Sequence, residues 1–279
     1  MTQANLPRKD ITVAFIGAGN MARSLIAGLV DDNSSLNIRV ADPDQAQLDV
    51  IRRHWPEVEM STDNLAMIDD ADMVVLAVKP QLMATVVTPL REKAQLQRPV
   101  FVSVAAGVLE SSLNGWLGGG LPVVRCMPNT PALVNAGATG LYANDLVTAE
   151  QRSQAESILR SVGIALWFDE ESKLDAVTAV SGSGPAYFFL VMEAMQKAAE
   201  SLGLKPDEAN LLVIQTALGA AKLALESDDM PAELRRKVTS RGGTTEAALA
   251  KLNEGGLIEL FDEALQAAAS RSRELAKLS

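Results

Sequence analysis

Two short stretches of the sequence combine glycines with small or hydroxyl side chains at points where helices are expected to begin. One is GAGNMA, residues 17–22, which directly follows the apolar run ITVAFI. The other is TSRGGTTEAA, residues 239–248, which lies between two segments of helical character. Because the first turn of a helix leaves its backbone N–H groups unpaired, both stretches are candidate sites for binding an anion.

The stretch GAGNMA fits the dinucleotide-binding pattern G-x-G-x-x-G/A through Gly17, Gly19 and Ala22. Gly17 allows the tight turn, Gly19 lets the backbone approach a pyrophosphate, and Ala22 permits close packing of helix on strand. Glycines after a strand are often only a turn, but here a helix follows and a second strand comes about 20 residues later, as the pattern requires. We therefore expect a bound dinucleotide, with a site that includes the other residues of the turn: Ala18, Asn20 and Met21.

The second expected strand ends in VADPD, which contains a further candidate for cofactor binding. Asp42 stands where an acidic residue usually accepts hydrogen bonds from the adenosine ribose of NAD. A carboxylate there repels a 2′-phosphate, so Asp42 favours NAD over NADP. The alternative is that Asp42 and Pro43 only form a strand-to-helix turn, with Asp44 starting the helix. Both interpretations stay open on the sequence.

Three more expected strands are followed by residues suited to lie against a cofactor: AVKP (77–80), VAAG (104–107) and MPNTP (127–131). In a parallel sheet, ligands sit at the carboxyl ends of the strands. Lys79 is then close to the expected cofactor, although it also fits a solvated lysine at a strand end. The small residues of VAAG let a flat ring approach the backbone, and prolines on both sides of Asn129 and Thr130 stiffen a turn.

The second glycine-rich stretch indicates an anion site outside the nucleotide-binding half. A predicted helix, PAELRRKVTS, ends at Gly242 and Gly243. Thr244 or Thr245 then caps the next helix, with Glu246 in its first turn. Glycines let the unpaired N–H groups face a ligand with no side chain in the way, and a carboxylate fits such a site. The alternative is an ordinary capped helix after a glycine stop.

The elements that position these residues fall into two classes along the chain. Up to about residue 168, apolar β-branched runs alternate with helical segments, which predicts an α/β, Rossmann-type doubly wound parallel sheet. The expected strands are 11–16, 37–41, 73–78, 99–104, 122–127, 139–143 and 164–168, and the expected helices between them include 20–30, 44–53, 80–93 and 148–162. From about residue 172 onward the chain reads as helices only. The predicted domains are a dinucleotide-binding domain over 1–170 and an all-α substrate-binding and dimerisation domain over 171–279.

The helical half carries its own signals. A helix expected over 173–202 contains SGSGPAY (181–187), whose proline and two glycines predict a break or a site of close access to the backbone. Helices expected over 207–226 and 256–278 carry narrow apolar stripes. A helical region of about a hundred residues is thin as a free-standing core. The stripes can pack on the Rossmann domain of the same chain or on a second copy, and a homodimer built from these helices is the favoured prediction.

Composition excludes several function classes. The formal net charge of −10 disfavours general binding to nucleic acid or to acidic membranes. A single cysteine, Cys126, and a single histidine, His54, exclude a disulfide framework and disfavour a metal site. Cys126 is expected in the core, and His54 lies at a polar helix end unsuited to a catalytic triad. With no signal peptide and no stretch close to the roughly 20 apolar residues of a membrane span, a cytoplasmic protein is expected.

Taken in order, the segments GAGNMA, AVKP, MPNTP, AVSGSGPAY and VTSRGGTTEAAL resemble the pyrroline-5-carboxylate reductase family over the length of the chain. The resemblance implies reduction of the cyclic imine L-1-pyrroline-5-carboxylate to L-proline with NAD(P)H, the final step of proline biosynthesis. It implies NADP as the cofactor, with NAD as the alternative that Asp42 leaves open. It also implies a homodimer through the C-terminal helices, with five such dimers often joined into a decamer.

The resemblance further implies roles for individual residues. The backbone amides of Gly242, Gly243 and Thr244, beside Ser240, hold the substrate carboxylate, and Thr245 is the catalytic residue, with its hydroxyl near the imine nitrogen. Residues that line the dinucleotide are Ala77, Val78, Lys79, Pro80, Ala105, Ala106 and Gly107, with Asn64 near the adenosine end. Asn129 is counted with the cofactor-binding residues, and it frames with SGSGPAY the pocket where ring and nicotinamide meet. The chemistry needs no metal, because a protonated imine is already electrophilic.

Two positions depart from the pattern of the family. Arg241 stands where many relatives have proline, and it adds positive charge near the substrate carboxylate. Lys237 stands where some relatives have asparagine, which puts any side-chain role at that position in doubt.

Two other functions were weighed. A β-hydroxyacid dehydrogenase needs a lysine within a glycine-rich helix opening, but SGSGPAYFFLVMEAMQK offers none until Lys197. A non-catalytic NAD(P)-sensing dimer would keep the GAGNMA turn but would have no need for GGTT.

Overall fold

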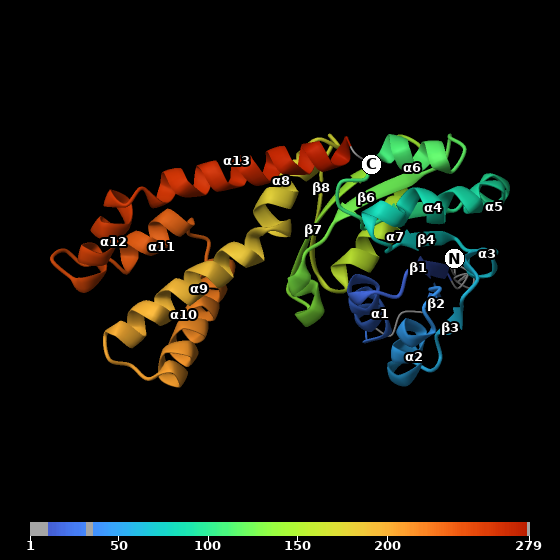
Figure 1. Ribbon diagram of the computed structural model, residues 1–279. Helices are drawn as coiled ribbons and strands as arrows, with labels where there is room; N and C mark the ends of the chain where they lie inside the picture. Colours follow the sequence, from blue (N-terminus) through green and yellow to red (C-terminus); the bar gives the residue numbers. More distant parts are fainter. Residues whose placement is uncertain (1–10, 32–35, 278–279) are drawn as a thin grey trace, which may run out of the picture. The chain divides into compact units, whose positions relative to one another are not determined.

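The computed structural model describes residues 11–31 and 36–277, and its described part forms two compact units (Figure 1). The first unit runs to Ser183 and resumes at Ala268, and the second comprises Gly184–Ala267. The predicted domain boundary after residue 170 lies earlier in the chain than this division, and it stays a prediction. The N-terminal stretch 1–10, expected to hold no signal peptide, lies outside the described residues.

The first unit contains a sheet of eight strands in the order β3-β2-β1-β4-β5-β6-β7-β8. The strands are β1 (Ile11–Ile16), β2 (Leu36–Ala41), β3 (Glu59–Ser61), β4 (Met73–Leu76), β5 (Val100–Ser103), β6 (Val123–Met127), β7 (Gly137–Ala143) and β8 (Gly163–Trp167). All seven expected strands are present. The additional one, β3, is an edge strand of three residues whose sequence, EMS, carries no apolar run.

The sheet is not wholly parallel, so that part of the prediction is wrong. β7 pairs with β6 in antiparallel register, and every other neighbouring pair is parallel. The reason is the length of the connection. Only a short 3₁₀ turn, η3 (Thr130–Val134), lies between β6 and β7, whereas a parallel connection needs a crossover of a dozen or more residues.

Helices cover both faces of the sheet (Figure 1). On β1, Val13 and Phe15 join one buried cluster while Ala14 and Ile16 join the other, as the two-residue period of a strand requires. The first cluster also contains residues of α1 (Asn20–Asp31), α2 (Gln45–His54) and α7 (Ala149–Arg160). The second contains residues of α3 (Asn64–Met67), α4 (Met83–Val87), η2 (Thr88–Leu90), α5 (Arg91–Gln97) and α6 (Glu110–Trp116). This is the doubly wound arrangement that the β-α alternation predicts.

Two expected helices need correction. The continuous helix expected over 80–93 is divided into η1 (Pro80–Leu82), α4, η2 and α5, with Pro89 inside η2. Proline lacks the N–H group that an uninterrupted helix would need there. The long helix expected over 173–202 begins as α8 (Lys173–Val177) and passes through a π turn, η4 (Thr178–Gly182), before α9 (Gly184–Ser201). The predicted break at SGSGPAY therefore takes the form of a change in hydrogen-bond pattern.

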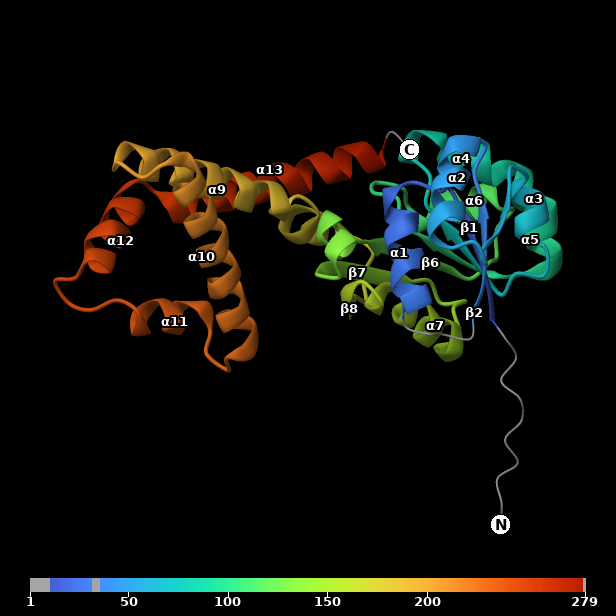
Figure 2. The same cartoon turned by 90° about the horizontal axis from the view of Figure 1, so that it is seen from below.

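The second unit is built from helices (Figure 2), and few of its residues are buried. They are α9, α10 (Pro206–Glu226), α11 (Pro231–Lys237), α12 (Thr244–Glu254) and most of α13 (Leu257–Ala276), which continues into the first unit. Within 184–267 the buried residues are Gly184, Ala209 and Val213. Large apolar side chains such as Phe188, at 67 %, and Leu211, at 68 %, are exposed instead.

The run Lys173–Ser201 is long and apolar enough to cross a membrane by length and composition, with a mean hydropathy of 1.2 over its most apolar window. The expectation that no stretch approaches a membrane span is therefore not met by this run. Only 17% of that window is buried. The same residues thus form much of the uncovered apolar surface of the helical half.

Candidate active site

The residues predicted to bind a dinucleotide meet at one edge of the sheet. β2, β1, β4, β5 and β6 are neighbours and run parallel, so their carboxyl ends lie together. Backbone hydrogen bonds tie the loops at this edge to the adjacent strands: Gly17 N–H to Ala41 O (2.8 Å), Ala77 N–H to Ile16 O (2.8 Å) and Val104 N–H to Leu76 O (3.1 Å). The segments 17–21, 42–44, 77–80, 104–107 and Asn129 therefore border one surface.

The two glycines of GAGNMA have different structural environments. Gly17 has a φ of +102°, and a Cβ built there would lie 2.7 Å from Ala77 O, so this position requires glycine. A Cβ on Gly19 would meet no atom within 4 Å, so its backbone faces open space. Ala22 is fully buried on α1 against the sheet. These are the roles that the dinucleotide-binding pattern assigns to the three positions.

Asp42 holds the first two loops together. Its Oδ2 accepts a hydrogen bond from Ala18 N–H (2.8 Å), and its Oδ1 accepts one from Asp44 N–H (2.9 Å). Asp44 in turn caps α2 by accepting from Ala46 N–H (2.9 Å). The turn interpretation of DPD is thus realised. Each carboxylate oxygen keeps a second lone pair, so Asp42 can also accept a hydrogen bond from a ribose hydroxyl. That role stays a prediction.

The surroundings of Asn64 indicate whether this edge of the sheet suits the adenosine part of a dinucleotide. It begins α3, whose cap residue Asp63 accepts from Leu65 N–H (2.9 Å). The Asn64 side-chain oxygen is buried and has no hydrogen-bond partner among the described residues. A buried acceptor left unpaired is unfavourable, so a ligand that donates a hydrogen bond fits this position. The hydroxyl and amino groups of an adenosine are such donors.

The other expected cofactor residues differ in exposure. Lys79 is exposed and precedes η1, in which Pro80 takes the first position, while Ala77 and Val78 are half-buried. Ala105 is buried, Ala106 is exposed, and Gly107 adopts a φ of +73°. The small side chains leave the backbone of both loops accessible at the sheet edge.

Asn129 is buried, with 8% exposure, and its amide is bonded at both ends. Its Nδ2 donates to Ser181 O (3.0 Å), and its Oδ1 accepts from Ala138 N–H (2.9 Å). The structure therefore places Asn129 at the expected sheet edge but bonds its amide within the protein. The contact with the π turn was missed from the sequence, since MPNTP and SGSGPAY are far apart in the chain.

The loop with the second glycine pair lies in the second unit and differs from expectation at its cap. α11 ends at Lys237, before the glycines, and Gly243 is the cap residue of α12, so neither threonine caps this helix. The Gly242 N–H donates to Glu246 Oε2 (2.7 Å), and the Gly243 N–H donates to Ser240 O (3.0 Å). Both glycine amides are thus bonded within the loop.

The amides of Thr244 and Thr245 belong to the first turn of α12, where an N–H group has no acceptor within the helix. Thr245 is half-buried and Thr244 is exposed. A Cβ on Gly243 would lie 2.5 Å from Ser240 Oγ and 3.0 Å from Ser240 O, so Ser240 packs closely against this glycine. The backbone donors that remain free beside Ser240 are therefore the N–H groups of Thr244 and Thr245. Those of the two glycines are already bonded.

Charged groups flank this loop. Lys237 forms a salt bridge with Asp229, and this hydrogen bond lowers the pKa of the Asp229 carboxyl below its usual value. Lys237 is therefore engaged within the second unit, and Arg241 is exposed. Among the described residues Arg241 has no ion-pair partner, so this loop carries a cationic side chain beside the N-terminal amides of α12.

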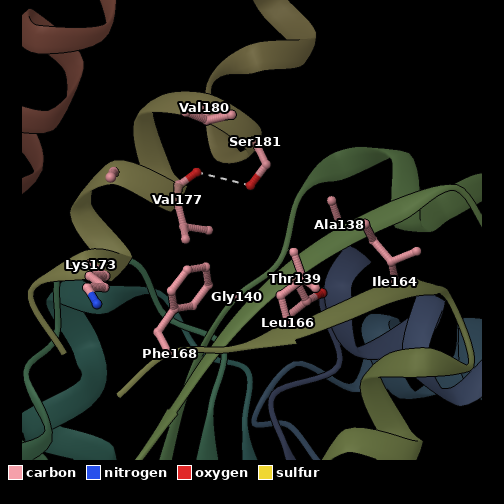
Figure 3. A pocket seen from close by; sticks show the side chains of 11 residues that line it. Ala138, Thr139, Gly140, Ile164, Leu166, Phe168, Lys173, Val177, Val180 and Ser181 are labelled. Carbon is pink, nitrogen blue, oxygen red and sulfur yellow. Dashed lines mark hydrogen bonds between the residues drawn. The ribbon is translucent and has the colours of Figure 1, made fainter. Parts of the chain in front are cut away.

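An apolar pocket of about 480 Å³ lies beside the π turn (Figure 3). It is lined by side chains of β7, β8, α8 and the π turn, among them Ile164, Leu166, Phe168 and Val180. Ser181 of SGSGPAY lines it, Ser181 and Ala138 of its lining both bond Asn129, and Lys173 is its one charged lining residue. The sequence signal was the outward alternation of Ile164 and Leu166 on β8. Its apolar character suits packing rather than chemistry.

Cys126 and His54 are the remaining side chains that could act as nucleophiles, bases or metal ligands. Cys126 is buried in β6, as expected, and burial raises the pKa of its thiol, which disfavours the reactive thiolate. His54 is the last residue of α2. In the part of the chain that the structure describes, no group of three or more His, Cys, Asp or Glu side chains is placed to hold a metal ion.

Comparison with known proteins identifies relatives over nearly the whole chain. Residues 171–275 match the family model described as pyrroline-5-carboxylate reductase dimerisation, and residues 12–107 match one described as NADP oxidoreductase coenzyme F420-dependent. The pyrroline-5-carboxylate reductase of Pseudomonas aeruginosa is 52% identical over 266 residues, which cover 95% of this chain and 97% of that protein. The one from Pasteurella multocida is 41% identical over 271 residues, covering 96% and 98%.

Solved structures give the same result. A pyrroline-5-carboxylate reductase from Coxiella burnetii superposes with a TM-score of 0.92 at 44% identity, covering 96% of this chain and 99% of that one. The pyrroline carboxylate reductase of Plasmodium falciparum, solved with NADP bound, gives a TM-score of 0.82 at 26% identity, covering 95% and 98%.

Proposed function

Because the chain belongs to the pyrroline-5-carboxylate reductase family, we propose that it reduces L-1-pyrroline-5-carboxylate to L-proline, the final step of proline biosynthesis. The observation that carries this proposal is the 52% identity to a reductase over 95% of the chain. The glycine-rich loops of both halves lie within that span. A β-hydroxyacid dehydrogenase would need a lysine near the start of α9, but α9 contains none before Lys197.

The carboxyl edge of the sheet is the proposed dinucleotide site. The N-terminus of α1 and the loop 17–21 would hold the pyrophosphate, and Asn64 and Asp42 would bind the adenosine. Lys79, Pro80 and the loop 105–107 would lie along the rest of the molecule. When bound in its reduced form, the dinucleotide supplies the hydride for the reaction.

The loop 240–245 is the proposed substrate site. The amides at 242–245 would hold the ring carboxylate, with Thr244 and Thr245 as first-turn donors of α12 and Ser240 beside them. For Gly242 to take part, Glu246 would have to give up the Gly242 N–H, to which it is now bonded. The Thr245 hydroxyl oxygen would accept a hydrogen bond from the protonated imine nitrogen and so stabilise its charge. The C=N bond then becomes a C–N bond as the ring carbon accepts the hydride.

We propose NADP as the cofactor, with NAD as the alternative. Support for NADP comes from the family model described as NADP oxidoreductase and from the relative solved with NADP. Support for NAD comes from the ends of β2 and β3, where Asp42, Asp44 and Asp63 supply carboxylates that a 2′-phosphate would meet. Measuring kcat/KM with NADPH and with NADH decides between the two.

We also propose a cytoplasmic homodimer through the C-terminal helices, with assembly of dimers into a decamer. The match of 171–275 to a dimerisation family supports an oligomer. The exposed apolar side chains of α9 and α10 give a physical reason, because exposed apolar area on this scale marks an interaction surface. The net charge of −10 argues against nucleic acid and acidic membranes as partners.

The activity is tested by following the oxidation of NADPH and NADH with pyrroline-5-carboxylate added. We expect oxidation that depends on the imine and saturates with it, and no oxidation of the dinucleotide without it. As a control, a β-hydroxyacid with the oxidised dinucleotide should give no reduction of the cofactor. Binding of the dinucleotide without any imine-dependent oxidation would contradict the proposal and would favour an NAD(P)-sensing dimer.

A further inference from the structure

The π turn between α8 and α9 contains a backbone carbonyl without its normal helical donor. In this turn Ser183 N–H reaches back five residues to Thr178 O (2.8 Å). In the α-helix that follows, Ser181 O would accept from the N–H of residue 185. Residue 185 is Pro185, which has no N–H group. The sequence SGSGP therefore leaves the Ser181 carbonyl to find another donor.

Asn129 supplies that donor. Its Nδ2 lies 3.0 Å from Ser181 O, and its Oδ1 accepts from Ala138 N–H at 2.9 Å. One buried amide thus joins three segments: the loop after β6, the start of β7 and the turn in the helix. Both ends of a buried amide bonded in this way fix its orientation, since either end left unpaired would be unfavourable.

A second contact holds the turn at the same place. A Cβ on Gly182 would lie 2.5 Å from Met127 Cε, so the turn packs directly on the last residue of β6. The Ser181 side chain points back into its own helix, where its Oγ donates to Val177 O (3.0 Å; Figure 3). The Ser181 carbonyl is therefore the group through which the turn is bonded to the sheet.

The position of this contact connects it to the reaction. Asn129 follows β6, whose neighbour β5 ends in the loop 104–107 that is proposed to lie against the dinucleotide. A shift of the turn at this edge would change the space in which the nicotinamide and the ring must meet. Rates of such reactions depend steeply on alignment of the reacting atoms.

We propose that Asn129 is a positioning residue that holds the Ser181–Pro185 backbone at the carboxyl end of β6 and does not itself contact the dinucleotide. This inference rests on the proposed reductase activity. It assigns to Asn129 of MPNTP and Pro185 of SGSGP a joint role, in which the proline frees a carbonyl and the asparagine binds it.

The test replaces Asn129 by aspartate, which keeps the acceptor for Ala138 N–H but cannot donate to Ser181 O. We expect Asn129→Asp to lower kcat with pyrroline-5-carboxylate about tenfold or more while the Kd for the dinucleotide, measured by fluorescence, stays unchanged. Asn144→Asp is the matched control. Asn144 bridges Val123 N–H and Leu121 O at the other end of β6, so this variant should lose stability but keep its kcat.

A second variant tests the link to Pro185. Pro185→Ala restores an N–H group that can bond Ser181 O, so the loss of kcat caused by Asn129→Asp should be smaller in the Pro185→Ala background. An unchanged kcat for Asn129→Asp, or a dinucleotide Kd that rises in step with the loss of kcat, would overturn the proposal. Equal losses in the two backgrounds would overturn the role of Pro185.

Hydrogen exchange separates failure of this inference from failure of the proposed function. Amides of the segment 178–190 should exchange faster in Asn129→Asp, or in Asn129→Ser if the aspartate variant does not fold, than in the unmodified protein. This measurement needs no substrate. Exchange at the unmodified rate would contradict the positioning role even in a protein that reduces no imine.

Discussion

At the scale of the residue, Asp42 combines a structural and a selective role. Its carboxylate accepts the Ala18 and Asp44 amides, so it fixes the glycine-rich loop relative to β2. We propose that the same charge faces the ribose of the dinucleotide, where it would repel the 2′-phosphate of NADP. The carboxylate that holds the loop would then disfavour NADP, which is bound in the structure of the Plasmodium falciparum relative.

Replacing Asp42 by asparagine should shift the choice of dinucleotide. We expect the ratio of kcat/KM for NADPH to that for NADH to rise about tenfold, because a repulsive charge near the phosphate is removed. Asp49→Asn, an exposed change on α2 away from the sheet edge, is the control and should leave the ratio unchanged. A ratio that does not move in Asp42→Asn would show that the carboxylate does not face the ribose.

The Thr245 hydroxyl is the proposed hydrogen-bond acceptor for the protonated imine nitrogen. Thr245→Ala should lower kcat roughly 10- to 100-fold and weaken substrate binding, since it removes the oxygen that stabilises the protonated imine. Thr244→Ala keeps both first-turn amides and serves as the control, with near-normal turnover expected in steady-state assays. An unchanged kcat/KM in Thr245→Ala would remove this residue from the mechanism.

Glu246 places a negative charge on the loop that is proposed to bind a carboxylate. Its Oε2 accepts the Gly242 N–H at 2.7 Å. Glu246→Gln keeps a hydrogen-bond acceptor but removes the charge, so the KM for pyrroline-5-carboxylate should fall by a factor of about three at low ionic strength. The difference from the unmodified protein should shrink as salt is added. A KM that rises instead would indicate that the charge supports the loop rather than opposing the substrate.

In the β1–α1 turn, the two glycines are needed for different reasons: Gly17 for the backbone conformation, and Gly19 for space beside the expected pyrophosphate. Gly17→Ala forces a Cβ toward Ala77 O at a φ of +102°, so we expect a loss of about 1–3 kcal/mol in unfolding free energy. Gly19→Ala meets no protein atom within 4 Å, so stability should be unchanged while dinucleotide affinity falls. Thermal unfolding and dinucleotide titration check both variants. Unchanged affinity in Gly19→Ala would place the pyrophosphate elsewhere.

Most elements were predictable because their signals are local. Strands such as 11–16 are continuous apolar runs, and the turn at Gly17 follows from spacing alone. The reversal at β7 was not predicted, since it depends on a short connection through η3 rather than on the strand's own residues. β3 lacks an apolar pattern because it is a three-residue edge strand.

Parts of the candidate site were predictable where a short local motif is enough to indicate the role of its residues. The Gly19 backbone and the sheet-edge loops were placed correctly by the order of strands. The Asn129–Ser181 bond joins residues 52 apart in sequence, so no local pattern reveals it. At the second glycine pair, the composition indicated free amides, but side chains and carbonyls of the loop itself bind the Gly242 and Gly243 donors.

At the scale of the whole molecule, the second unit lacks the buried core that a free-standing helical domain needs. Phe188 and Leu211 are exposed by about two thirds, and we propose that a second copy of the chain covers such residues. Phe188→Glu with Leu211→Glu should convert the dimer to monomers in light scattering. Leu96→Glu, at an 83% exposed position on α5, should leave the dimer intact. A dimer that persists in the double variant would place the interface on other residues.

The proposed transfer of a hydride to the imine carbon of pyrroline-5-carboxylate can be followed by isotope tracing. The dinucleotide, deuterated at both hydrogens of C4, is incubated with the imine and the protein, and the product is analysed by mass spectrometry and NMR. We predict proline with one deuterium on the ring carbon that formed the C=N bond. Proline without deuterium at that carbon, or no proline at all, would rule out hydride transfer from the dinucleotide to the imine.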